Sequence, residues 1–189
     1  MREYIPTNIG FENLLCVLIL LSRLGDIGST YLITPKLKLE TNPIARKLGW
    51  WFAIATVFVC LVPYYSTALA IVILVPSLMV CAANTGKVWF ARAYGEDNYH
   101  ELILNVARRS RLSHALIPTL VAAIFTALIG LILLMLSPDP TNWGYWFAQG
   151  FLAYAFVIGF YGSLFFVRLF RRAKREDKKP DHPAGKPSC

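Results

Sequence analysis

The sequence predicts an all-α fold, a polytopic transmembrane helical bundle with five spans and one interfacial amphipathic helix. Its composition is 56% hydrophobic and only 16% charged, with a mean hydropathy of +0.50, whereas about a quarter of the residues of a soluble domain carry charge. The apolar runs are long and continuous, unlike the alternating strands of a transmembrane β-barrel. The basic residues gather in the segments between these runs and at the C-terminal end, as in membrane proteins oriented by the positive-inside rule.

Local signals place the boundaries of the spans. Thr34-Pro35 ends the first, because the residue before proline is pushed out of helical geometry, and Asn42-Pro43 is a favoured helix start. The uncharged run over 50–84 would reach about 52 Å as one helix, well beyond a hydrocarbon core of about 30 Å, so we expect a break at Pro63. The five spans are therefore expected at about 11–33, 44–63, 66–86, 112–136 and 143–168.

A charged segment separates the third and fourth predicted spans. Asp97 can cap a helix in which Tyr99, Leu102, Ile103 and Val106 follow the spacing of one apolar face. Such a helix would lie on the membrane surface. An ordinary solvated connector is an equal alternative.

The distribution of Lys and Arg predicts the orientation. With five spans, 17 of the 19 Lys and Arg residues fall on one side, whereas four spans, without a break at Pro63, would divide the chain's basic residues far less unevenly. We therefore expect an inner-membrane protein with its N-terminus outside and its C-terminus in the cytoplasm. Residues 1–170 would form the transmembrane bundle, and 171–189 a disordered, basic cytoplasmic tail.

A polar stripe lies within the first predicted span. Ser22, Arg23, Asp26, Ser29 and Thr30 fall in an arc of about 120° on a helix. Arg and Asp each cost about 2.5–3.5 kcal/mol near the centre of a span. The two charges should therefore face the bundle interior and pair, with each other or across helices. The neighbours expected at similar depth are Asn84, His114, Ser163 and Glu40.

Ionisable groups inside a membrane mark binding or permeation sites, although an ion pair that only fixes helix register is an equal alternative. We predict a non-enzymatic protein that binds or moves a small ion or an anionic lipid headgroup in the cytoplasmic half of the first span. The predicted binding residues are Arg23, Asp26, Thr30, Glu40, Asn42 and His114.

Two other functions are considered. One is an intramembrane hydrolase acting on lipid, with Asp26 and either Glu40 or a histidine, but the chain has no HExxH or GxSxG motif. The other is a structural partner of other membrane helices through the small-residue pairs Ala123/Ala127 and Ala155/Gly159.

The sequence predicts no metal site and no cofactor, because its four cysteines show no CxxC spacing. The predicted partners are the lipid bilayer, anionic lipid headgroups at the basic tail, and other membrane helices. Nucleic acid is not expected, because no aromatic platform accompanies the basic residues.

The pattern Asp26-x-x-x-Thr30 followed by Glu40-x-Asn42-Pro43 resembles the signature of a family of small prokaryotic multi-span membrane proteins of unknown function. The resemblance covers about residues 14–85 and implies a membrane location without a particular activity. Arg23, the last two spans and the basic tail lie outside the matching motif.

Overall fold

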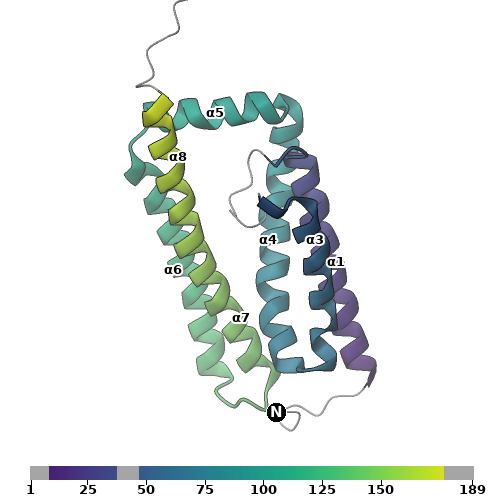
Figure 1. Ribbon diagram of the computed structural model, residues 1–189. Coiled ribbons are helices and arrows are strands. Elements are labelled where there is room, and N and C mark those ends of the chain that lie inside the picture. Colours follow the sequence, from purple (N-terminus) through teal and green to yellow (C-terminus); the bar gives the residue numbers. More distant parts are fainter. Residues whose placement is uncertain (1–8, 38–46, 177–189) are drawn as a thin grey trace, which may run out of the picture.

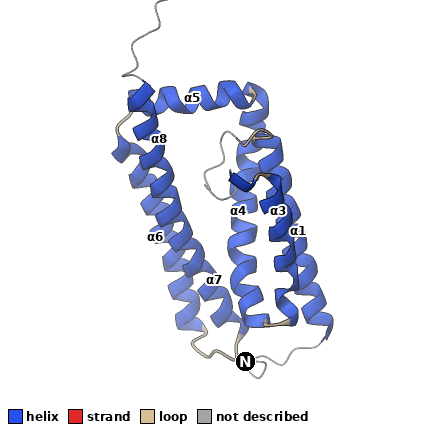
Figure 2. Cartoon of the chain, viewed as in Figure 1, coloured by secondary structure: helices blue, strands red, loops and turns tan. Residues whose placement is uncertain are grey.

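The computed structural model describes residues 9–37 and 47–176, and within these ranges the regular elements are all helices (Figure 2). In chain order they are α1 (Ile9–Ile33), α3 (Trp50–Val57), η1 (Phe58–Tyr64), α4 (Thr67–Tyr94), α5 (Glu96–Arg109), α6 (Leu112–Leu136), α7 (Trp143–Val157), η2 (Ile158–Gly162) and α8 (Ser163–Glu176).

Four helices are long and apolar enough to cross a membrane: Gly10–Ile33, Thr67–Tyr94, Leu112–Leu136 and Trp143–Arg175. The last of these runs through α7, η2 and α8, where the short η2 segment is a single π-helical stretch. The predicted fold class, an all-α helical bundle, is confirmed, and its long apolar helices indicate a membrane protein.

The predicted second span, 44–63, is a shorter apolar helix, Trp50–Tyr64. Gly49 has a φ of +62°, which separates this helix from the helical residues 47 and 48 before it. The second half of the helix is a 3₁₀ helix that contains Pro63. At about 1.5 and 2.0 Å per residue its two halves reach about 26 Å, short of a core of about 30 Å. The count of five long spans is thus corrected to four long helices and one short one; residues 44–46 lie outside the described ranges.

The helices alternate in direction (Figure 1). α1 runs up in this view, α3 and η1 run down, α4 runs up, α6 runs down, and α7 and α8 run up. α5 lies across one end of the bundle. The five predicted spans therefore correspond to helices that alternate in direction, although the helix of the second span is short.

Two predicted boundaries differ in the structure. The helix of the third span continues past residue 86 to Tyr94. Residues 171–176, predicted as the start of a disordered tail, continue α8. The reason is tertiary: Phe170 and Ala173 of α8 are buried against Leu104 and Ala107 of α5. Residues 177–189 lie outside the described ranges.

The predicted amphipathic helix is present as α5, which begins after Gly95 at a φ of +74°. Leu104 and Ala107 face α8 and are 5% exposed. Leu102 and Val106 of the predicted apolar face are 40% and 57% exposed. A helix with exposed apolar side chains across the end of a bundle suits a membrane surface.

Small residues set the distance between α6 and the continuous helix of α7 and η2. A Cβ at Gly130 would lie 3.1 Å from the Ala148 carbonyl oxygen, and one at Gly159 would lie 3.5 Å from the Ala123 Cβ. Because lipid tails are as apolar as the side chains, such close packing drives helix association in membranes. Ala123 and Gly159, one member of each predicted pair, therefore face each other within the chain.

Candidate functional site

Arg23 and Asp26 lie on the same side of α1, and each contacts α4. Their nearest charged atoms, Arg23 Nη1 and Asp26 Oδ2, are 3.8 Å apart, with side chains 20% and 23% exposed. Arg23 Nη2 donates a hydrogen bond to Ser77 Oγ of α4. Asn84 Nδ2 of α4 donates to Asp26 Oδ1 at 2.9 Å. The two charges are thus held across the α1–α4 interface as well as by each other.

Gly25 lets α1 and α4 approach at this level. A Cβ at Gly25 would lie 2.6 Å from the Cys81 Sγ, which leaves no room for a side chain unless Cys81 moves. Along α1, Arg23, Gly25 and Asp26 meet in turn Ser77, Cys81 and Asn84 of α4. Because the residue numbers increase in the same direction on both helices, the two helices run parallel here. The glycine contact lies between the two polar contacts and keeps both within hydrogen-bonding reach.

The guanidinium of Arg23 retains donors that the described residues do not use. Its Nε is buried and has no hydrogen-bond partner among them. The 3.8 Å separation from Asp26 is too long for a hydrogen bond, and the other Asp26 oxygen accepts from Asn84. An arginine has five N–H donors in a fixed fork. Arg23 can therefore accommodate a further acceptor.

Ser77 and the two serines of the polar stripe each donate a hydrogen bond to a backbone carbonyl of their own helix. Ser77 is 1% exposed and donates its hydroxyl proton to the Ile73 carbonyl at 2.7 Å, so its oxygen is left to accept from Arg23. Ser22 donates to the Ile19 carbonyl and Ser29 to the Asp26 carbonyl. Backbone bonding of this kind satisfies a hydroxyl in a membrane helix.

The site lies near the middle of α1, on the side of its midpoint nearer Ile33. Arg23 is ten residues from Ile33, which corresponds to about 15 Å along the helix axis. At such a distance from the end of a helix that crosses a membrane, charged side chains need partners inside the protein.

The structure brings together some of the predicted site residues and not others. Asn84, one of the expected neighbours, contacts Asp26. Thr30 is half-buried one turn further along α1, and its carbonyl accepts from the Thr34 backbone. Glu40 and Asn42 lie outside the described ranges.

His114 is not part of this cluster. It is exposed in the first turn of α6, and its backbone N–H bonds to the Arg111 carbonyl. α6 packs against α7, η2 and α8. Ser77 is the residue that the sequence analysis missed, because a single serine in an apolar run gives no signal of its partner.

A second polar contact fixes the end of α1 to the start of α5. Thr34 hydrogen-bonds to the Glu96 carboxylate, and the Lys36 backbone N–H donates to Glu96 Oε2 at 3.0 Å. Lys36 Nζ lies 3.6 Å from Asp97 Oδ2. These acidic side chains are in the first turn of α5, where negative charge is favoured.

No group of three His, Cys, Asp or Glu side chains that could hold a metal ion occurs within 9–37 and 47–176. The comparisons with known proteins gave no match, whether to a family model, a curated protein or a solved structure. The resemblance through Asp26, Thr30, Glu40, Asn42 and Pro43 therefore stays a prediction.

Proposed function

We propose that the chain is a non-enzymatic inner-membrane protein that binds a small ion or an anionic lipid headgroup at Arg23. Its N-terminus would be outside and its C-terminus in the cytoplasm. The alternation of the helices supports this orientation, because the basic end of α8 lies at the same end of the bundle as α5, whose last turn holds Arg108 and Arg109 (Figure 1). Arg23 is then in the cytoplasmic half of the first span.

The observation that carries the proposal is the buried Nε of Arg23, which has no partner among the described residues. A buried donor without an acceptor costs about 1–3 kcal/mol, and more when it is charged. Because Asn84 holds one Asp26 oxygen, Asp26 does not use the whole arginine fork. An oxygen of a carboxylate or phosphate group would accept from that fork through charge-assisted hydrogen bonds.

A structural tie between α1 and α4 is the second candidate, favoured by the Arg23–Ser77 and Asp26–Asn84 contacts. It predicts loss of stability, and no loss of a bound group, when the contacts are removed. The hydrolase has less support, because His114 starts α6 away from this cluster.

Native mass spectrometry of the purified full chain, in a neutral detergent, tests the proposal. We expect a retained anion or anionic lipid in the wild type and at least one bound copy fewer in Arg23→Gln, whereas Asp26→Asn, which removes a negative charge 3.8 Å from Arg23, should not reduce retention. Arg109→Gln removes the same charge from exposed α5 and serves as the matched control. Unchanged retention in Arg23→Gln would exclude Arg23 from the site, and a wild type without any retained group would leave only the structural tie.

The orientation has its own test. A periplasmic-type phosphatase fused after the last residue should stay inactive, because that enzyme works only outside the cytoplasm. Activity of the fusion would reverse the proposed orientation.

A further inference from the structure

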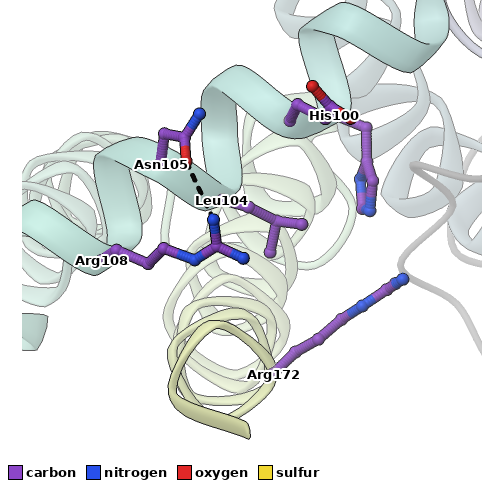
Figure 3. Close-up of a pocket in the computed structure, with 6 residues that line it drawn as sticks. His100, Leu104, Asn105, Arg108 and Arg172 are labelled. Carbon is purple, nitrogen blue, oxygen red and sulfur yellow. Dashed lines mark hydrogen bonds between the residues drawn. The ribbon is translucent and has the colours of Figure 1, made fainter. Parts of the chain in front are cut away.

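A cavity of about 390 Å³ lies where α5 meets α8. Its lining residues are His100, Glu101, Leu104, Asn105, Arg108 and Arg172. His100, Leu104 and Arg108 are four residues apart along α5 and project on the side that faces Arg172 of α8 (Figure 3). A volume of this size is in the range of small-molecule sites.

The walls of the cavity are held by packing of the two helices. Leu104 is 5% exposed and packs in one cluster with Phe170 and Ala173 of α8. Arg172 lies between those two residues in the sequence. This apolar contact holds together the two helices that carry Arg108 and Arg172.

The charge of the lining is positive. The lining holds two arginines, one histidine and one acidic side chain, Glu101, so its arginines outnumber its carboxylate. Arg108 Nη1 donates to Asn105 Oδ1 at 3.0 Å, which orients the guanidinium along α5 (Figure 3). Guanidinium forks match the oxygens of phosphate and carboxylate groups better than the point charge of lysine does.

The position of the cavity favours phosphate. Leu102 and Val106 of α5 are 40% and 57% exposed, and apolar side chains of this kind place an amphipathic helix at the level of lipid headgroups. Arg109, Arg171 and Arg175 are exposed close by in the sequence, and basic pockets at the ends of membrane helices bind anionic headgroups.

We propose that this cavity binds a phosphate group, presented by an anionic lipid headgroup or as free phosphate. The site is separate from the one at Arg23 and does not depend on it. Arg108 and Arg172 hold the phosphate oxygens from two helices, and Asn105 keeps Arg108 in place. Occupancy would strengthen the contact between α5 and the end of α8.

The test measures binding to the full chain in neutral detergent by isothermal titration calorimetry. The probes are dioctanoyl phosphatidylglycerol, inorganic phosphate, and dioctanoylglycerol, which has the same acyl chains without phosphate. We expect Arg108→Gln and Arg172→Gln each to weaken phosphatidylglycerol binding about tenfold, as for the loss of a charge-assisted hydrogen bond. Arg109→Gln removes an equal charge from a neighbour that does not line the cavity, and should leave the affinity unchanged.

Asn105→Asp keeps the helix and places a negative charge in the lining, so it should weaken binding even where an arginine variant fails to fold. Competition by inorganic phosphate identifies free phosphate as a ligand, whereas binding of the lipid alone identifies the headgroup; either supports the site. Equal weakening by Arg109→Gln, or no weakening by Arg108→Gln and Arg172→Gln, overturns it. In the Arg23→Gln background the same ranking of the Arg108, Arg172 and Arg109 variants should be found, so the two sites can fail separately.

Discussion

Replacing Gly25 by alanine tests the close approach of α1 and α4 that the polar site requires. Gly28→Ala is a matched control three residues further along the same helix. A Cβ at Gly25 would lie 2.6 Å from the Cys81 Sγ, whereas no atom outside its own helix lies within 4 Å of a Cβ at Gly28. The two substitutions add the same methyl group to the same helix interior and differ only in what that group contacts.

The expected magnitudes follow from this difference. Glycine in a helix interior is destabilising by about 0.5–1 kcal/mol relative to alanine, so Gly28→Ala should raise the free energy of unfolding by that amount. Gly25→Ala gains the same helix propensity but overpacks the interface, which typically costs about 1–3 kcal/mol. Gly25→Ala should therefore be less stable than Gly28→Ala by about 1–3 kcal/mol.

Equilibrium unfolding in mixed micelles with rising SDS measures both free energies. A double variant, Gly25→Ala with Cys81→Ala, removes the sulfur that the new methyl group meets, so it should recover most of the difference from the control. Equal stability of Gly25→Ala and Gly28→Ala, or no recovery in the double variant, would refute the close packing of Gly25 on Cys81.

Three further results are expected. Asn84→Ala removes the donor at 2.9 Å from Asp26 Oδ1 and should lower the free energy of unfolding by about 0.6–1.7 kcal/mol in the same SDS titration, the range of hydrogen bonds between membrane helices; no loss would contradict the contact. Gly130→Val should cost about 1–3 kcal/mol by separating α6 from α7, because a Cβ there already lies 3.1 Å from a backbone oxygen; wild-type stability would contradict that packing. Hydrogen bonds from Thr141 lower the pKa of Asp139 from 3.8, the larger effect from its backbone N–H and the smaller from its hydroxyl. Thr141→Ala removes the hydroxyl and should raise this pKa in a carboxyl NMR titration. An unchanged pKa would show that the hydroxyl does not act on Asp139. Because the folded pKa is the lower one, the ionised Asp139 stabilises its loop above about pH 3.8, and this contribution is lost as the pH falls through the folded value.

The fold class could be predicted because its signal is local. Continuous apolar runs, a lack of charge over 50–84 and the placement of Lys and Arg each depend on neighbouring residues alone. The length of the second span could not be predicted in this way. Gly49 and the 3₁₀ half of the Trp50–Tyr64 helix shorten it, and the tertiary contacts that select these conformations have no periodic signature.

The polar site could be predicted in part. The energetic cost of Arg23 and Asp26 in lipid requires that they face protein, and Asn84 was one of few polar side chains at a matching depth. Ser77 could not be found, because which hydroxyl accepts from Arg23 depends on the register of α1 against α4. The Thr34–Glu96 contact joins residues 62 positions apart, and the helical continuation to Glu176 depends on the contact of α8 with α5.

The contacts of α1 explain why its polar residues are compatible with a stable bundle. Near its start, Asn13 accepts a hydrogen bond from the Tyr64 hydroxyl of η1 at 2.7 Å. Arg23 bonds to α4 in the middle, and the segment just after α1 bonds to Glu96 of α5.

The contact of α6 with α7 and η2 is made by close packing at Gly130 of α6 and Gly159 of η2. α4, which packs against α1, also meets α7, where a Cβ at Gly150 would lie 2.8 Å from the Val75 Cβ. In lipid, apolar side chains gain little by leaving the acyl chains for one another, so helices associate through hydrogen bonds or through small residues. α1 uses both means, because its charged pair bonds to α4 on either side of the Gly25 contact with Cys81.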